Sequence, residues 1–399
     1  MLRTQTDILI CGGGVAGLTA AAAFGTAGFS VICVDPNPPV TSASDDGADL
    51  RSTAFLQPSI PVLTAAGLWA RLEPFAAALQ IMRIIDAGGA VPEPRLIKDF
   101  DAADVSDQPF GWNLPNWLLR REMVAHLANL PGVDFRPGVG MAQVLIRASE
   151  ALVRLTDGSR ITAKLLIAAD GRDSPVRQAL GIDVKTTRYG QKALAFAVTH
   201  PVPHQNISTE IHRTGGPFTL VPLPDRDGLP ASAVVWMDNG PEIARRAALS
   251  DAEFEAEMTA RSCHILGPLT LASRRSVWPI ISQMADRMAG ERTALIAEAA
   301  HVMPPIGAQG LNMSLADIAA LLDLAVANRA GLGDVRMLDA YHRRRHMQVQ
   351  VRVTGVDALN RASMLGAPAL RNLRAGALEA LYAVTPVRKT LMRTGLGIS

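Results

Sequence analysis

Three glycines and one acid near the N-terminus have the types and spacing of a nucleotide-binding turn. Gly12, Gly14 and Gly17 form the pattern G-x-G-x-x-G, and Asp35 follows 18 residues after the last of them. The first glycine permits a tight turn, the second lets backbone N–H groups approach a pyrophosphate, and the third lets a helix pack close to a sheet. The acid can accept hydrogen bonds from a ribose diol. Together they predict that the chain binds an adenine dinucleotide.

The residues around this motif have the strand, helix and strand pattern that such a site requires. Ile8 to Cys11 are a continuous apolar run, residues 18–24 read as a helix of small residues, and residues 30–34 read as a second strand. No second G-x-G-x-x-G follows a strand further along the sequence, because residues 138–140 lack the third glycine and the helix. The single dinucleotide site therefore holds either NAD(P) or FAD.

A second stiff, glycine-spaced stretch, EAAHVMPPIGAQGLN, occupies residues 298–312. An apolar run at 293–297 precedes it and reads as a strand, and a strongly helical segment follows it. The stretch opens with Glu298 and contains His301, two prolines that stiffen it and two glycines that allow close backbone approach. A turn of this composition predicts a second point of contact with a bound group.

Other candidate residues lie between these two stretches. Arg51 ends a polar loop and could neutralise a pyrophosphate or be a surface arginine. Arg120 and Arg121 open an amphipathic helix and could face a phosphate or solvent. Asp170 follows an apolar strand and precedes a basic turn, and Ser174 is placed to cap the next helix, so this segment could also be plain strand–turn–helix structure.

Composition limits the class of protein. The chain has 399 residues, is 48% hydrophobic and carries a net charge of +2, so it can form a large core and gives no case for nucleic acid as a partner. Its three cysteines are far apart and suit a reducing cytosol, and we expect no metal site. We find no signal peptide, and glycines interrupt the apolar residues 18–34, so we expect a cytoplasmic protein without a membrane span there.

The second half of the chain contains a strand-rich region and then a basic, helical tail. Residues 185–285 alternate in the manner of strands and predict an appended antiparallel sheet that faces the substrate. Residues 249–266 within them read as a helix capped by Ser250. The tail, residues 331–399, has eleven Lys and Arg against four Asp and Glu. Its basic amphipathic helices suit an anionic membrane surface or an acidic partner, or equally a helix packed on the domain with solvated arginines.

Four features in this order resemble one known family. They are the first glycine motif with Asp35, Arg51 after its loop, ADGRDSPVR at 169–177, and the stretch at 299–312. The set resembles the flavoprotein aromatic hydroxylases of the para-hydroxybenzoate hydroxylase fold, and residues 49–69 look most like the ubiquinone-biosynthesis branch.

The resemblance implies an α/β protein with a Rossmann-like FAD-binding domain, an inserted antiparallel-sheet substrate domain and a C-terminal helical region. The implied ranges are 1–75, 100–182 and 286–330 for FAD, 76–99 and 183–285 for substrate, and 331–399 for the helical region.

The resemblance also implies the chemistry. NAD(P)H would reduce FAD, and a flavin C4a-hydroperoxide formed with O2 would hydroxylate an aromatic ring, here a prenylated phenol of ubiquinone biosynthesis. The enzyme could lie on the inner membrane or within a ubiquinone-biosynthesis complex. His301 and Pro305 are the candidate catalytic residues. The candidate FAD-binding residues are Gly12, Gly14, Val15, Ala16, Gly17, Asp35, Arg51, Arg121, Asp170, Glu298, Pro305, Gly307, Gln309, Gly310, Leu311 and Asn312.

The sequence departs from the family pattern at the second stretch. The family usually has Gly-Asp where this chain has Ala297-Glu298, and many members have Gly where it has Ala308. FAD could bind more weakly, or Glu298 could substitute for the usual acid, and His301 could serve only to order the loop. Two alternatives remain open: an FAD reductase of related fold, and a non-catalytic flavoprotein of a biosynthetic complex.

Overall fold

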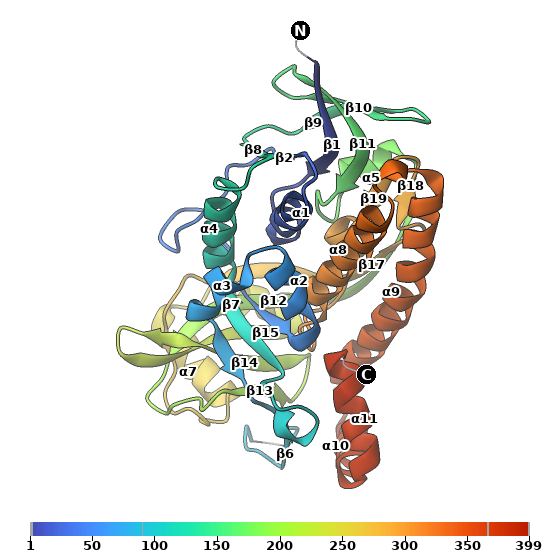
Figure 1. Ribbon diagram of the computed structural model, residues 1–399. Coiled ribbons are helices and arrows are strands. Elements are labelled where there is room, and N and C mark those ends of the chain that lie inside the picture. Colours follow the sequence, from blue (N-terminus) through green and yellow to red (C-terminus); the bar gives the residue numbers. More distant parts are fainter. Residues whose placement is uncertain (1–2, 90, 365–366, 398–399) are drawn as a thin grey trace.

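The first glycine motif follows the carboxyl end of a central strand in an eight-stranded sheet built around parallel strands (Figure 1). The computed structural model describes residues 3–89, 91–364 and 367–397. Its parallel strands lie in the order β19 (Thr293–Leu295), β11 (Arg160–Ala168), β1 (Arg3–Cys11), β2 (Val31–Asp35) and β8 (Val133–Pro137). Antiparallel strands at its margins are β9 (Met141–Ile146), β10 (Ala151–Leu155) and β18 (Ala289–Gly290).

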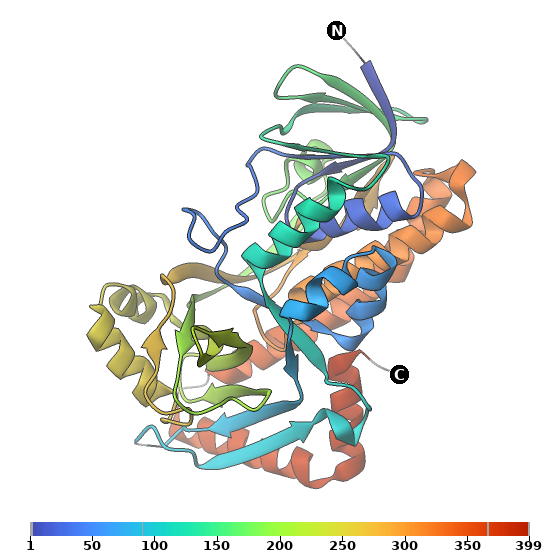
Figure 2. The same cartoon turned by 60° about the vertical axis from the view of Figure 1, so that its left-hand side comes forward.

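Long helices cover this sheet and bring the two glycine-spaced stretches together. They are α1 (Val15–Thr26), α4 (Asn116–Leu127), α8 (Gln309–Ala327) and α9 (Val335–Met364). Helix α1 packs against α4 and α8, and α9 packs against α8, as Figures 1 and 2 show. Within the part of the chain that the structure describes, α8 alone is long and apolar enough to cross a membrane, but it is partly buried and packs against α1 and α9.

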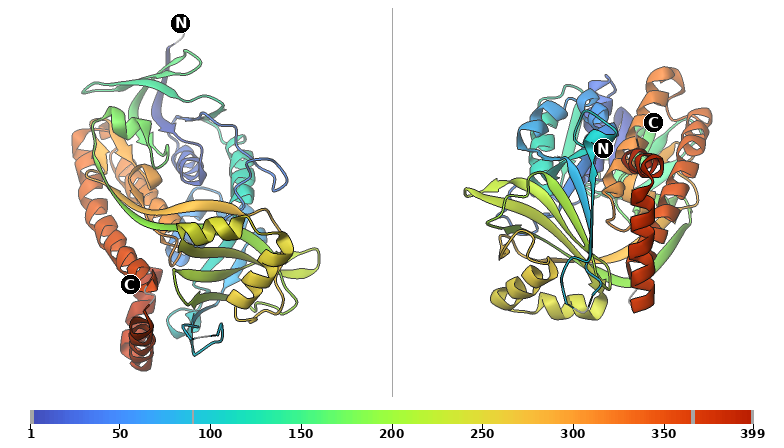
Figure 3. Two further views of the ribbon diagram at one scale, coloured as in Figure 1. Left: turned by 180° about the vertical axis from the view of Figure 1, so that it is seen from behind. Right: turned by 90° about the horizontal axis from the view of Figure 1, so that it is seen from below.

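A nine-stranded sheet forms the second half of the molecule. Its order is β20 (His301–Val302), β17 (Ser276–Ala285), β12 (Val184–Thr199), β15 (Leu229–Asn239), β14 (Pro217–Arg226), β13 (Ile207–His212), β5 (Ile81–Asp86) and β6 (Leu96–Asp101), and β16 (Thr270–Leu271) pairs with β12. The long strands β12 and β17 connect the two halves (Figure 3). Helices α6 (Gly240–Ala247) and α7 (Asp251–Arg261) lie against this sheet, and Phe254 of α7 packs on Trp236 and Phe196 of its core.

Smaller elements complete the fold. A three-stranded sheet has the order β3 (Ser52–Leu56), β7 (Gly111–Pro115) and β4 (Ala77–Leu79). The remaining helices are α2 (Ile60–Ala65), α3 (Trp69–Leu72), α5 (Pro175–Ala179), α10 (Pro368–Ala383) and α11 (Thr385–Leu396). The short 3-10 helices are η1 (Gln57–Ser59), η2 (Glu73–Phe75), η3 (Ala102–Asp104), η4 (Ala297–Ala299) and η5 (Arg329–Gly331).

The structure confirms the predicted fold class and corrects several details. The appended sheet is antiparallel except that β5 and β13 pair in parallel, because β5 arrives from an earlier part of the chain. The strand expected at 293–297 ends at Leu295, because Ala297 has a positive φ of 56° and starts η4. The predicted caps are confirmed: Ser174 Oγ accepts from Arg177 N, and Ser250 forms a capping box with Glu253. The division of the chain into residue ranges stays a prediction.

Candidate cofactor-binding site

The first turn, residues 12–17, is shaped by close backbone contacts. Gly12 has a φ of +113°, and a Cβ on Gly17 would lie 1.8 Å from Gly12 O, so neither position accepts a side chain. In contrast, a Cβ on Gly14 would meet nothing within 4 Å. Helix α1 starts at Val15 without a side-chain cap and without an acid in its first turn. The first turn therefore presents an open helix N-terminus, which favours an anion.

Asp35 stands over the first turn from the end of β2. Its Oδ2 accepts a hydrogen bond from Gly13 N at 2.5 Å, and its Oδ1 accepts one from Asn37 N at 2.8 Å. Asp35 lies where the sequence placed it, but in this structure its carboxylate stabilises the glycine turn itself.

The second turn, residues 297–310, also leads into an open helix N-terminus. Gly307 and Ala308 both have positive φ, and α8 begins at Gln309 without a side-chain cap and without an acid in its first turn. Gly310 is exposed, with open space where a Cβ would be. Pro305 is exposed as well, whereas Pro304 is buried. The helix expected after this stretch therefore begins within it, at Gln309, and Gly310 in its first turn is exposed.

Asn312 holds this second turn against the rest of the protein. Its Oδ1 accepts hydrogen bonds from Leu56 N at 2.8 Å and Ser59 Oγ at 2.6 Å. Its Nδ2 donates to Ala54 O at 2.8 Å and Ala308 O at 2.6 Å. With four bonds to protein groups, Asn312 contributes through the position of the turn, and its amide is fully used.

Glu298 and His301 have different surroundings. The Glu298 side chain is 47% exposed and lies 3.4 Å from Arg172 Nε, so it can turn towards a ligand. The His301 ring is buried, and its Nε2 lies 2.7 Å from Asp317 Oδ2. The bond to Asp317 fixes the orientation of the ring, and a catalytic role for His301 stays a prediction.

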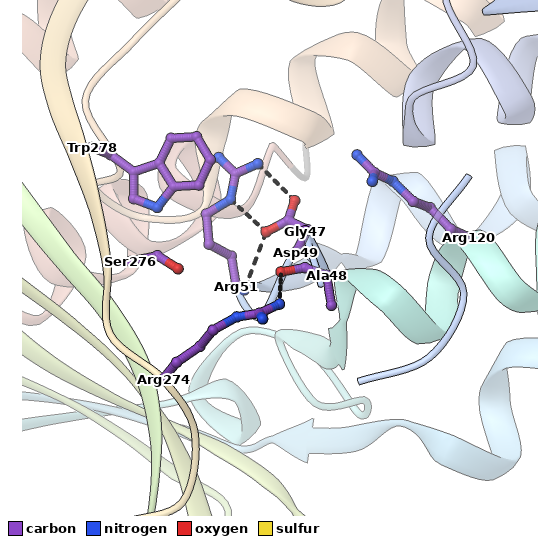
Figure 4. Close-up of a pocket in the computed structure, with 8 residues that line it drawn as sticks. All are labelled: Gly47, Ala48, Asp49, Arg51, Arg120, Arg274, Ser276 and Trp278. Atoms are coloured by element: carbon purple, nitrogen blue, oxygen red, sulfur yellow. Dashed lines mark hydrogen bonds and ion pairs between the residues drawn. The ribbon is translucent and has the colours of Figure 1, made fainter. Parts of the chain in front are cut away.

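A cavity of about 440 Å³ lies between the loop before β3, helix α4 and strand β17 (Figure 4). Asp49 and Arg51 lie in the loop before β3, and Arg120 lies on α4. Trp278 belongs to β17, and Arg274 lies just before that strand. Its other lining residues are Gly47, Ala48 and Ser276. With three arginines and one acid, its lining is suited to an anion.

Arg51 is fixed within this cavity between an acid and an aromatic ring. Its guanidinium forms two hydrogen bonds to Asp49, at 2.8 and 2.7 Å, and lies 4.0 Å over the Trp278 ring. Burial alone would raise the pKa of Asp49, but the bonds from Arg51 outweigh it and hold that pKa below its usual value. Burial opposes the charge of Arg51, yet Asp49 and Glu298 raise its pKa, so Arg51 stays cationic beside the second turn.

Two buried donors of the cavity have no partner among the described residues. Arg120 Nε and Trp278 Nε1 are both inaccessible to solvent and unbonded. An unpaired buried donor is costly, and an ordered water or ion commonly satisfies such an atom. The residues that carry these two atoms line the same cavity as Arg51.

The structure separates the two arginines that the sequence left undecided. Arg120 lines the cavity, whereas Arg121 forms an ion pair with Glu122 at 2.9 Å and lies over the Trp117 and Phe75 rings. Arg121, the residue selected from the sequence, therefore lies outside the cavity. Adjacent helical residues differ by about 100° in direction, so only packing decides which of them faces a site.

Asp170 has a local function in the structure. Its Oδ1 accepts from Ser174 Oγ at 2.5 Å and its Oδ2 from Val176 N at 3.0 Å, which closes the start of α5. Burial raises the pKa of Asp170 above its usual value despite these bonds. The sequence reasoning missed Asp49, Arg274 and Asp317, because they carry no motif and acquire their neighbours only in the fold.

These features define a protein that binds an elongated dinucleotide, and comparison with known proteins agrees. The chain belongs to the family described as the FAD binding domain, whose model matches residues 5–355. It is 30% identical over 397 residues to the ubiquinone hydroxylase UbiL of Rhodospirillum rubrum, covering 98% of this chain and 89% of that protein. It is 26% identical over 412 residues to the 3-demethoxyubiquinol 3-hydroxylase of Escherichia coli, with both chains fully covered.

Solved structures show the same fold. The p-nitrophenol 4-monooxygenase PnpA of Pseudomonas putida superposes with a TM-score of 0.80 at 19% identity, over 99% of each chain. PqsL of Pseudomonas aeruginosa, in complex with 2-aminobenzoylacetate, superposes with a TM-score of 0.78 over 94% of this chain. The family resemblance drawn from the sequence is therefore confirmed.

The residues present fit FAD. Two uncapped helix N-termini, the open positions at Gly14 and Gly310, and the arginine-lined cavity together suit a pyrophosphate and the electron-rich edge of a flavin. No group of three or more His, Cys, Asp or Glu side chains that could hold a metal occurs in the described parts of the chain.

Proposed function

We propose that the protein is an FAD-dependent monooxygenase that hydroxylates the aromatic ring of a prenylated phenol in ubiquinone biosynthesis. The observation that carries this proposal is the similarity to ubiquinone hydroxylases over nearly the whole chain, with both turns in place. FAD, when bound, supplies the redox chemistry, with NAD(P)H as the reductant and O2 as the oxygen source.

In this proposal the two turns hold opposite ends of the cofactor. Gly12, Gly14 and Gly17, with the N–H groups of Val15 and Ala16, hold the pyrophosphate, and Asp35 accepts from the adenosine ribose. Arg51 and Arg120 add positive charge from the cavity. Each of these groups binds or orients, and none forms a covalent bond.

At the second turn, Glu298 accepts from a hydroxyl of the chain that links the pyrophosphate to the flavin. Pro305, which is exposed, would contact the flavin, and the N-terminus of α8 at Gln309, Gly310 and Leu311 would favour negative charge on it. Gly307 allows the turn to approach the ring. The aromatic substrate lies towards the nine-stranded sheet, where the protein excludes water from the reaction.

The C-terminal helices favour a position at an anionic membrane surface. One face of α10 exposes Leu373, Ala377 and Leu381, and Val384, which directly follows the helix, is exposed as well. The opposite face is anchored, because Tyr382 packs on Phe100 of β6 and donates to Asp99 O. The next helix, α11, carries Lys389 and Arg393, whereas Arg388 is bonded to Asp104 and lies over the Tyr382 ring on the anchored side. Apolar residues beside cations suit a surface of anionic lipid, where a prenylated substrate resides.

The first test is the visible spectrum of the purified protein, with release of the cofactor on denaturation. Flavin bands and released FAD support the proposal, and turnover with NAD(P)H, a prenylated phenol and oxygen-18 gas then follows. A product that gains one heavy oxygen atom supports hydroxylation. A product that gains hydrogen without oxygen indicates the related reductase, and bound FAD without any turnover indicates a non-catalytic flavoprotein of a biosynthetic complex.

Membrane binding needs a separate test. The protein should sediment with vesicles of anionic lipid at low salt, and Leu381→Asp together with Lys389→Glu should abolish this while the FAD spectrum stays unchanged. Equal sedimentation of the variant and the unmodified protein would contradict the proposed surface.

A further inference from the structure

Behind the second turn lies a buried ionic cluster, which consists of His301, Asp317 and Arg345. Asp317 is on α8 and is fully buried. Its Oδ2 lies 2.7 Å from His301 Nε2 and accepts from Ala297 N at 3.3 Å, and its Oδ1 accepts from Arg345 Nε at 2.8 Å. One carboxylate therefore joins the start of the second turn to two other elements.

Arg345 brings the C-terminal helix α9 into this arrangement. Besides its bond to Asp317, its Nη2 donates to Met313 O of α8 at 3.2 Å. One turn earlier on α9, the buried Tyr341 donates its hydroxyl hydrogen to Leu295 O at 2.8 Å. Helix α9 thus holds the end of the strand that enters the second turn and the first turns of the helix that leaves it.

The surroundings favour the charged form of Asp317. Burial would raise the pKa of Asp317, but His301 and Arg345 outweigh burial and hold that pKa below its usual value. A buried ion pair is seldom a strong source of stability compared with apolar packing, and its best-supported use is to fix one geometry.

The second turn has an unusual backbone conformation. Ala297 and Ala308, near the two ends of the second turn, have φ values of 56° and 55°, in a region that residues with a side chain rarely occupy. Backbone of this kind persists where surrounding contacts over-determine it. Asp317 contacts the N–H of Ala297 directly.

We infer that Arg345, Asp317 and His301 are positioning residues for the flavin. Through Ala297 N and Met313 O they set the direction of the N–H groups at the start of α8, and so the stabilisation of negative charge on the flavin edge. The inference rests on the proposed function only in requiring that FAD occupies the second turn. It makes the C-terminal helix α9 a part of the cofactor site, although α9 carries no cofactor-binding motif.

A pair of neighbouring arginines on α9 gives a matched test. Arg345→Met breaks the buried cluster, whereas Arg344→Met breaks only the surface ion pair between Arg344 and Asp323 of α8, whose side chains are 49% and 61% exposed. The measurements are the FAD dissociation constant, the absorption spectrum of the bound flavin and its two-electron reduction potential, all without membranes.

Arg345→Met should weaken FAD binding at least tenfold and should weaken binding of reduced FAD tenfold more than that of oxidised FAD. The second effect lowers the potential by about 30 mV. Arg344→Met should match the unmodified protein in all three measurements. If Arg345→Met leaves the affinity and the potential unchanged, or if Arg344→Met changes them equally, the inference is wrong.

Substitutions at His301 keep the test decisive if Arg345→Met does not fold. His301→Gln keeps a donor for Asp317 and should retain the flavin spectrum and potential, whereas His301→Leu removes the donor and should lower the potential. Equal potentials in these two variants would overturn the inference. An unmodified protein that binds no FAD would instead refute the proposed function, so the two failures are distinguishable.

Discussion

The two turns that start α1 and α8 present similar open helix N-termini, but the protein holds them in different ways. The first turn depends on glycine: Gly12 has a positive φ, and Gly17 touches the backbone of Gly12. The second turn has Ala297 and Ala308 in left-handed conformations and is held by side chains from other elements. A turn built from glycine is encoded locally, whereas a turn held by distant contacts can tolerate a departure from the family pattern.

The largest expected effect is at the third glycine of the first turn. Gly17→Ala places a Cβ 1.8 Å from Gly12 O. Because Gly12 O is a backbone atom in a packed turn and cannot move aside easily, we expect the free energy of unfolding to fall by about 3 kcal/mol or more. Urea unfolding of the FAD-free protein measures this. Gly376→Ala, on α10 with open space around it, is the control and should raise stability slightly.

The next effect is at the residue that anchors the second turn. Asn312→Leu removes four hydrogen bonds and leaves Leu56 N and Ala54 O without their partner. We expect a loss of about 2–3 kcal/mol. Asn129→Leu, at an exposed asparagine with one bond to Ala125 O, should change stability by less than about 0.5 kcal/mol. Similar losses in the two variants would show that the second turn does not depend on this anchor.

A third substitution separates folding from cofactor binding in the first turn. Gly14 has an ordinary φ of −71°, and a methyl group at this position would meet open space. Gly14→Ala should therefore change the free energy of unfolding without FAD by less than about 0.5 kcal/mol. The methyl group lies where the pyrophosphate must approach, so the FAD dissociation constant should rise tenfold or more, which is about 1.4 kcal/mol. Titration of the FAD-free protein followed by flavin fluorescence decides this, and unchanged affinity would place the pyrophosphate elsewhere.

The smallest expected effect is a gain in stability at the residue that precedes α8. Ala308→Gly relieves a left-handed residue and should raise the free energy of unfolding by about 0.5–1 kcal/mol, since the added freedom of the unfolded chain offsets part of the benefit. Ala320→Gly, within the same helix, should lower it by about 1 kcal/mol. If Ala308→Gly is as harmful as Ala320→Gly, the conformation of Ala308 is not strained in the folded protein.

Local patterns in the sequence determined much of the architecture. The first turn, the strands and helix around it, the caps at Ser174 and Ser250 and the presence of a second stiff turn were all predictable, because each depends on residues a few positions apart. The parallel pairing of β5 with β13 was not, because it joins segments more than a hundred residues apart.

Only the tertiary structure decided which of two adjacent arginines faces the protein interior and which faces solvent. Arg120 faces the cavity and Arg121 does not, and Arg345 is buried against Asp317 while Arg344 lies at the surface. The sequence determined that these arginines stand on helices. Because each helical residue is turned by about 100° from the one before, the packing of the whole helix selects which arginine enters the interior, and that packing is set by residues far away in the chain.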